Sequence, residues 1–193
     1  MAGINSIAVF CASRPGARPA YLAAAQALGE GLAAAGIRLV YGGGRIGLMG
    51  ALADAALAGG GTVTGVIPAF LVAWEVAHPG VRDMVVTDSM HSRKQIMAER
   101  ADAFVMLPGG LGTLDEIVEI ITWRMLRLHD KPILLCDVEG STLPLRSAID
   151  TAIAEGLATD AARAAFEVVE GVPALLARLQ SLPGGAAADL SRS

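Results

Sequence analysis

The chain has 193 residues, of which 53% are hydrophobic, 18% charged and 4% aromatic, and its 15 Lys and Arg against 19 Asp and Glu give a formal charge of −4. This length suits one domain with a buried core, whereas a disordered chain would combine low hydrophobicity with high net charge. Because the chain is mildly acidic and has no basic stripe, we expect no nucleic-acid partner.

Short apolar runs alternate with longer segments of helical pattern. Runs of strand length lie at 6–12, 37–41, 62–67, 84–87, 103–107, 132–136 and 167–169. Helical patterns cover 19–35, 47–58, 90–100, 113–128, 143–155 and a last segment after 169. Such alternation predicts right-handed βαβ crossovers, and continuous Val, Ile, Leu and Phe suit strands covered on both sides. The predicted fold is α/β, a Rossmann-like doubly wound parallel sheet with helices on both faces. We expect a single domain over 1–182 and a disordered tail at 183–193.

The uncharged segment from Ala55 to Trp74 is long enough in principle to cross a bilayer. Its glycines at 59–61 and Pro68 instead indicate a helix end, a strand and a turn, so no membrane association is expected. The N-terminus lacks the charged start of a secretory signal. Cys11 and Cys136 each end an apolar run without a second thiol or histidine at metal spacing. These features predict a reduced, cytoplasmic protein.

Glycines 42, 43, 44 and 47 lie between a strand and a helix with the spacing of a dinucleotide-binding fingerprint. The next strand ends in Val66-Ile67-Pro68, without the acidic residue that would hold the ribose hydroxyls of a nicotinamide dinucleotide. The glycines therefore fit either a tight turn or a ligand contact. A P-loop is excluded because no glycine-rich turn is followed by Lys and then Ser or Thr.

The run Pro108-Gly109-Gly110-Leu111-Gly112-Thr113 closes another strand and opens a long helix. Its glycines let the backbone approach a ligand closely, and the N–H groups at the helix start form an anion site, so a phosphate is the expected occupant. The alternative is that Thr113 is the N-cap of the helix and Glu116 its capping-box partner. That alternative leaves the glycines and the proline unexplained.

The run Met90-His91-Ser92-Arg93-Lys94 follows a strand and starts a helix. Two adjacent cations at a helix N-terminus oppose the macrodipole unless an anion or a carboxylate compensates them. This placement favours a functional role for Arg93 and Lys94. His91 also fits an ordinary exposed residue, and Met90 an ordinary cap on the apolar core.

Together these motifs resemble the LOG (Lonely Guy) family of cytokinin riboside 5′-monophosphate phosphoribohydrolases, many of which have been labelled lysine decarboxylases. The resemblance extends over residues 7–182 and includes the runs at 9–11, 42–44, 49–50, 90–94, 108–116 and 122–132. One departure lies in the first loop, which has Cys11-Ala12-Ser13-Arg14 where many relatives have Cys-Gly-Ser-Ser. Base preference is therefore the least transferable inference.

The resemblance implies hydrolysis of the N-glycosidic bond of adenine-type nucleoside 5′-monophosphates, with no metal and no cofactor, by a homodimer. It implies that Glu116 stabilises positive charge at C1′ and orients or deprotonates water. Arg93 would neutralise the phosphate or keep that carboxylate ionised. Asp115 is the weaker candidate because it points about 100° away around the helix. The implied substrate contacts are Ser13, Gly43 and Met90 at the base or ribose, Lys94 as a supporting cation, and Gly109, Gly110, Gly112 and Thr113 at the phosphate.

Two other hypotheses stay open. A pyridoxal-phosphate-dependent decarboxylase needs a Schiff-base lysine, and Lys94 and Lys131 are the two lysines of the sequence. A non-catalytic carrier of a nucleotide or of the molybdenum cofactor would use the same glycine loops for binding, without a carboxylate beneath the sugar. Release of free adenine from AMP would separate an enzyme from a carrier.

Overall fold

Parallel strands build one sheet in the computed structural model, which describes residues 3–74 and 76–183. Within these ranges the strands are β1 (Ser6–Phe10), β2 (Arg38–Tyr41), β3 (Val63–Pro68), β4 (Asp83–Thr87), β5 (Ala103–Met106), β6 (Ile133–Asp137) and β7 (Glu167–Glu170). Their order across the sheet is β4-β3-β2-β1-β5-β6-β7, and each neighbouring pair is parallel. The chain therefore winds outward from β1 in both directions, which confirms the predicted fold class.

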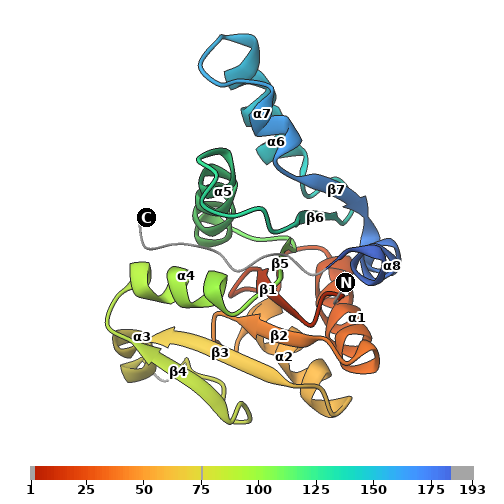
Figure 1. Cartoon of the computed structure of the whole chain (residues 1–193). Helices are drawn as coiled ribbons and strands as arrows, with labels where there is room; N and C mark the ends of the chain where they lie inside the picture. The colour runs from red at the N-terminus through yellow and green to blue at the C-terminus, as the bar shows by residue number, and fades with distance from the viewer. Residues whose placement is uncertain (1–2, 75, 184–193) are drawn as a thin grey trace.

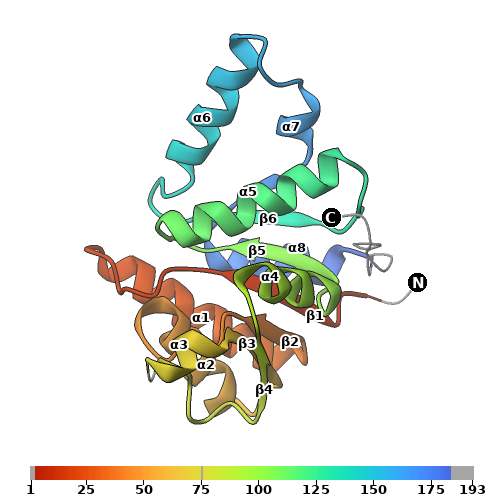
Figure 2. The same cartoon turned by 90° about the vertical axis from the view of Figure 1, so that its left-hand side faces the viewer.

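Helices cover both faces of the sheet (Figures 1 and 2). They are α1 (Pro19–Ala35), α2 (Gly47–Ala58), α3 (Ala69–Ala73), α4 (Met90–Glu99), α5 (Leu111–Met125), α6 (Leu143–Ala154), α7 (Ala161–Ala164) and α8 (Gly171–Ser181). One apolar cluster joins α1, α2 and α8 to the sheet, and a second joins α4, α5 and α6 to its other face. Because the strands are parallel and the helices lie on the two faces, the loops that follow the strands gather at one edge of the sheet.

Side-chain alternation along β1 explains why both faces are covered. Ile7 and Val9 belong to the cluster on the α1 side, while Ala8 and Phe10 belong to the cluster on the α5 side. Phe10 stacks on Phe104 of β5, with ring centroids 6.3 Å apart. A strand with apolar residues on both sides needs a helix layer on each of them.

The structure differs from the sequence predictions in a few places. Helices α1 and α2 have the predicted bounds, whereas α3 and α7 were not predicted and α5 begins at Leu111 instead of Thr113. None of the described helices is both long enough and apolar enough to cross a membrane. Pro183, the first residue of the expected tail, forms an isolated bridge with Gly3. The rest of that tail, 184–193, lies outside the described residues.

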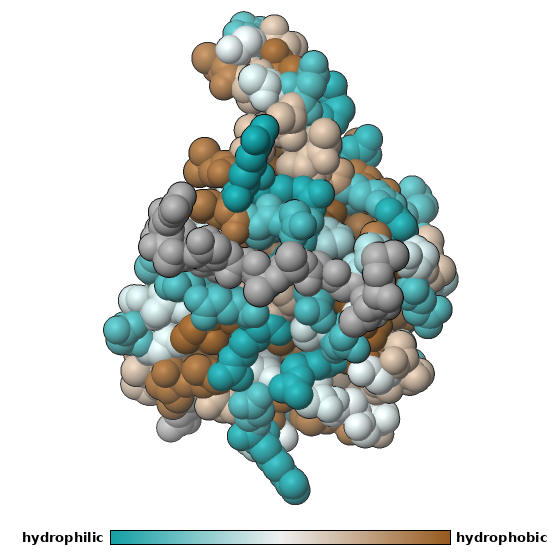
Figure 3. Space-filling model, in the orientation of Figure 1, coloured by the Kyte–Doolittle hydropathy of each residue, from teal (hydrophilic) through white to brown (hydrophobic). Residues whose placement is uncertain are grey.

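Helices α6 and α7 project away from the sheet (Figures 1 and 2). Leu145 is the buried residue of α6, and Leu143 and Leu157 are exposed. Hydrophobic residues reach the surface at this projecting end (Figure 3).

Candidate active site

A cavity of about 510 Å³ lies at the carboxyl ends of the central strands. Its walls come from the loops after β1 and β2, the end of β3 with the α3 segment, the first turn of α4, and the start of α5. In a doubly wound sheet these loops converge where the chain reverses direction, which is the usual ligand position. In this sheet the reversal occurs at β1, which has β2 on one side and β5 on the other.

An ion pair between α4 and α5 lies at the base of this cavity. Arg93 Nη1 donates to Glu116 Oε1 at 3.0 Å, and each residue is only 7% exposed. Two backbone carbonyls hold the guanidinium in place: Nε donates to Val66 O at 3.0 Å and Nη2 to Gly42 O at 3.2 Å. Arg93 is therefore fixed by three other segments of the chain, and its carboxylate partner compensates the cation at the start of α4.

Burial raises the pKa of Glu116 above its ordinary value, and the positive charge of Arg93 opposes that rise. A carboxylate in a low-dielectric site is costly unless a cation and hydrogen bonds stabilise it. Arg93 supplies that stabilisation. The arrangement holds a carboxylate at the cavity wall with little water around it.

The start of α5 presents backbone N–H groups to the cavity. Its N-cap is Gly110, which offers no side-chain cap, and the first intrahelical bond runs from Leu114 N to Gly110 O. The N–H groups of residues 111–113 therefore have no partner within the helix. Thr113 is the third helical residue and not the N-cap, so the capping-box alternative is wrong. An uncapped helix N-terminus of this kind attracts anions.

By contrast, the start of α4 is capped. Ser89 accepts a hydrogen bond from Ser92 N at 3.1 Å, and Ser92 Oγ accepts one from Ser89 N at 3.3 Å. This reciprocal pair is a capping box. The capping box satisfies the N–H groups of Ser89 and Ser92, so α4 contributes to the site mainly through the Arg93 side chain.

Glycines in the β2–α2 loop make room for the ion pair. A Cβ at Gly42 would overlap Arg93 Nη2, and one at Gly43 would press on Ile67 and Met84. Gly43 also has a φ of +73°, in the left-handed region that favours glycine. Close packing thus requires glycine at Gly42 and Gly43, and Gly42 and Gly44 also line the cavity.

The cavity brings together most of the predicted site residues. Its lining includes Ser13, Met90, Arg93, Gly110, Gly112, Thr113 and Glu116, and it does not include Gly43, Gly109 or Lys94. A Cβ at Gly109 would overlap the Thr113 side chain, so this glycine packs beneath the helix start. Lys94 faces away, with Nζ 3.0 Å from Asp115 Oδ2 and 2.6 Å from Glu119 Oε2.

Sequence reasoning did not place the apolar wall of the cavity. Ile67 near the end of β3, Leu71 in α3 and Val76 after α3 line it. The signal available was the apolar run that follows a strand at its carboxyl end, which is where ligands bind in such sheets. Arg14 also lines the cavity, although the sequence singled it out only as a departure from the family pattern.

Known proteins resemble this chain in sequence. The family described as "Possible lysine decarboxylase" matches residues 49–179. A cytokinin riboside 5′-monophosphate phosphoribohydrolase from Rhodococcoides fascians is 45% identical over 178 residues, which are 92% of this chain and 90% of that protein. The chain belongs to the LOG family. An Arabidopsis thaliana relative of the same name in this family is 47% identical over 81% of this chain and 74% of its own length.

Solved structures resemble this LOG-family chain in fold. The molybdenum cofactor binding protein from Rippkaea orientalis has a TM-score of 0.67 at 20% identity, covering 94% of this chain and 97% of that one. The molybdenum cofactor carrier protein from Chlamydomonas reinhardtii has a TM-score of 0.66 at 22% identity, covering 93% and 96%. At this identity the likeness establishes a shared architecture.

Proposed function

We propose that this chain hydrolyses the N-glycosidic bond of adenine-type nucleoside 5′-monophosphates, including AMP and cytokinin riboside monophosphates, to free base and ribose 5-phosphate. The observation that carries the proposal is the buried Glu116 carboxylate, held by Arg93 at a cavity that the uncapped start of α5 also lines. The relatives named phosphoribohydrolases support it over most of the chain.

The 5′-phosphate binds at the start of α5 in this proposal. The N–H groups of residues 111–113 lack helical partners, and Gly110, Gly112 and Thr113 line the cavity there. The helix dipole favours an anion at this end. Because Glu116 lies one turn further along the same helix and on the cavity side, a nucleotide held by its phosphate brings its ribose to the carboxylate.

Glu116 then stabilises the reacting sugar. As the bond from C1′ to the base nitrogen breaks, its electron pair leaves with the base and positive charge develops on C1′ and the ring oxygen. The carboxylate opposes that charge and orients or deprotonates the water whose oxygen joins C1′, while a proton reaches the base nitrogen. The positive charge of Arg93 favours the ionised carboxylate, and the hydrogen bonds of Arg93 to Glu116, Val66 O and Gly42 O hold the pair in place.

In this proposal the base binds the apolar wall of the cavity. Ile67, Leu71 and Val76 line the cavity there, Met90 lines it from the start of α4, and none of them carries a charge. Ser13 lines the cavity at the end of β1 and meets the ribose or base in this proposal. Base recognition therefore rests on apolar contact and backbone groups.

The decarboxylase hypothesis lacks a lysine in the cavity. Lys94 pairs with Asp115 and Glu119, and Lys131 is buried, where its Nζ donates to Ala98 O at 2.8 Å. Neither lines the cavity. A Schiff-base role requires a lysine amine at the reacting carbon, so these positions favour hydrolysis over decarboxylation.

The proposal is tested by replacing Glu116. Glu116→Gln keeps the size and the contact with Arg93 but removes the negative charge, so adenine release from AMP should fall on the order of 100-fold or more while AMP binding persists. Asp115→Asn is the matched control, because Asp115 is the neighbouring carboxylate, pairs with Lys94 and does not line the cavity. This control should keep its turnover.

Chromatographic detection of free adenine measures both variants. Wild-type protein that binds AMP and releases no base would indicate the carrier function instead. Near-wild-type release by Glu116→Gln would overturn the catalytic role of the carboxylate. Comparing AMP with isopentenyladenosine monophosphate then establishes which base the apolar wall prefers.

We also propose that the chain forms a homodimer through α5. Leu111, Val118 and Met125 are exposed and lie on one stripe of this helix, about two turns apart, and Leu126 extends the stripe. An exposed apolar stripe of this kind is typical of an interface. Sedimentation equilibrium tests it: Val118→Glu with Met125→Glu should convert a dimer to a monomer, and a wild-type monomer would overturn it.

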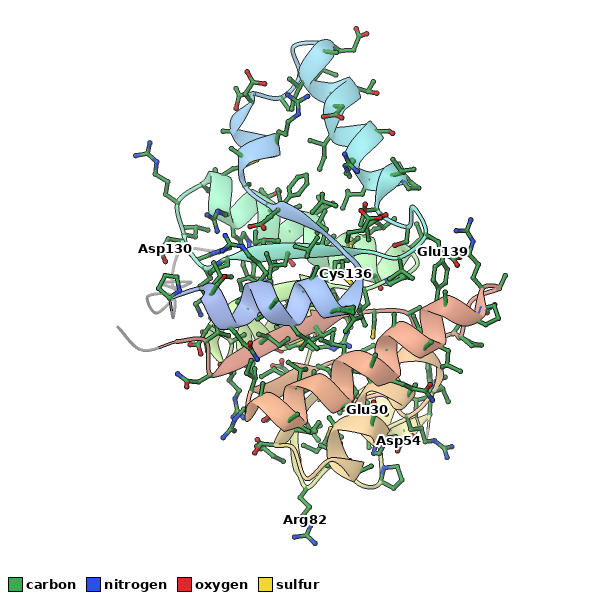
Figure 4. The ribbon with its side chains drawn as sticks, turned by 90° about the vertical axis from the view of Figure 1, so that its right-hand side faces the viewer. Glu30, Asp54, Arg82, Asp130, Cys136 and Glu139 are labelled. Carbon is green, nitrogen blue, oxygen red and sulfur yellow. The ribbon has the colours of Figure 1, made fainter. Side chains whose placement is uncertain are left out.

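A cytoplasmic location completes the proposal. Cys11 and Cys136 are both unpaired and buried. Cys136 is the penultimate residue of β6 (Figure 4). Free thiols suit a reducing compartment, and fractionation of expressing cells would test this location.

A further inference from the structure

The positive charge that lines the cavity is too small to neutralise the phosphate that we expect to bind there. Arg14, Arg93 and Glu116 are its charged lining residues among those described. Arg93 and Glu116 neutralise each other at 3.0 Å. A 5′-phosphate that carries close to two negative charges is thus left with the partial charge at the start of α5 and with Arg14.

Arg93 cannot turn to the phosphate without abandoning its partners. Its Nε, Nη1 and Nη2 donate to Val66, Glu116 and Gly42, and the side chain is almost fully buried. Swinging it outward would leave the Glu116 carboxylate buried and unpaired, which is costly. In place, Arg93 has only its two remaining N–H groups to offer, and its charge is already matched by Glu116, so neutralising the phosphate calls for a second cation.

The backbone around Arg14 is anchored on both sides. On one side, Ala12 N donates to Pro108 O at 3.2 Å, in the loop that leads to α5. On the other, Met49 N donates to Ala12 O at 3.2 Å, and a Cβ at Gly47 would overlap the Arg14 backbone. The loop that carries Arg14 is thus held between the starts of α2 and α5.

The strand order decides which end of the substrate Arg14 faces. Along the sheet the strands run β3, β2, β1, β5, so the loop after β1 adjoins the loop after β5, where the phosphate site lies. The apolar wall at Ile67 and Leu71 belongs to the β3 side, with β2 in between. The loop that carries Arg14 therefore lies next to the phosphate site and is separated from the β3 wall by the β2 loop, so a long side chain on it can reach the phosphate.

We propose that Arg14 is the side chain that pairs with the 5′-phosphate and makes this chain selective for phosphorylated ligands. Arg14 is exposed at the cavity mouth, and none of the ion pairs or side-chain hydrogen bonds of the described residues uses its guanidinium. An arginine fork matches phosphate oxygens in a two-pronged contact. This inference rests on the proposed function, since it assumes a nucleoside monophosphate in this cavity.

Arg14→Ser tests the proposal with little risk to folding, because the side chain is exposed. The KM for AMP should rise about tenfold, the low end for a charged hydrogen bond at an exposed site, while kcat changes less than about twofold. The KM of Arg14→Lys for AMP should lie between those of the wild type and Arg14→Ser. Arg82→Ser is the matched control: it makes the same change of net charge, does not line the cavity, and its side chain points into solvent (Figure 4).

A binding experiment separates failure of this inference from failure of the proposed function. Titration calorimetry of the Glu116→Gln protein with AMP and with adenosine measures the phosphate contribution without hydrolysis. Adding Arg14→Ser should lower the affinity for AMP about tenfold and leave the affinity for adenosine unchanged. Equal weakening of both ligands, or an AMP affinity equal to that of the Arg82→Ser control, would overturn the role of Arg14. Wild-type protein that binds AMP without hydrolysing it would overturn the proposed function alone.

Discussion

Replacing Arg93 with alanine probes the energetic basis of the site. The substitution removes the cation 3.0 Å from Glu116 and leaves that carboxylate buried. Breaking a buried pair by removing one partner costs about 3–5 kcal/mol, because the remaining charge has no compensation. The loss of the hydrogen bonds to Val66 O and Gly42 O adds a second destabilisation that does not depend on pH.

The charge part of this loss depends on pH with a definite sign. The folded pKa of Glu116 is already raised by burial, and without Arg93 it rises further. Between the ordinary pKa and the raised one, the folded state keeps a proton that the unfolded state has released, so stability falls as pH increases. Each unit of additional pKa rise contributes about 1.36 kcal/mol. The difference between wild type and variant should therefore be smallest near the ordinary carboxyl pKa and largest well above it.

Urea unfolding between about pH 4.5 and pH 8 measures this difference. Trp123 on α5 is buried in the folded protein, so its fluorescence reports the transition. In a double variant that combines Arg93→Ala with Glu116→Gln, the pH-dependent part should disappear while the pH-independent part stays. A single Arg93→Ala variant whose loss is the same at every pH would refute the assignment of Arg93 as the partner of a buried carboxylate.

Three further outcomes follow from the packing of the site. Gly42→Ala should displace the Arg93 guanidinium and lower kcat/KM for AMP at least about tenfold, with cooperative urea unfolding retained. Gly47→Ala should lower the melting temperature, because its φ is +63° and a Cβ would overlap the loop after β1; an unchanged melting temperature would contradict this. Burial raises the pKa of Cys11, and that of Cys136 to about 12, so a thiol reagent at pH 8 should label neither in the folded protein and both in urea.

The sequence could predict the sheet and the glycine loops because both follow from local patterns. Apolar runs separated by helical patterns require crossovers, and the predicted bounds of α1 and α2 agree with the structure. The Pro108 to Thr113 run was identified as a helix start because glycines and a following helix occur together there. These features need no knowledge of long-range contacts.

Long-range contacts explain what the sequence could not predict. Helix α5 begins at Leu111 because Gly110 serves as the cap, whereas local pattern favours Thr113 as one. The partner of each cation at the start of α4 depends on how α4 packs on α5: Arg93 meets Glu116, and Lys94 meets Asp115 and Glu119. Two neighbouring positions thus face different surroundings, which adjacency in the sequence does not reveal.

The Arg93 and Glu116 pair also sets a limit on how far this fold can be made heat-resistant. A well-packed apolar pair of similar volume in place of a buried ion pair is often more stable by about 1–4 kcal/mol. A directed-evolution experiment that selects for thermal resistance alone would therefore favour loss of this pair. Such a selection needs a simultaneous requirement for turnover, and its gains should come from positions outside the contact between α4 and α5.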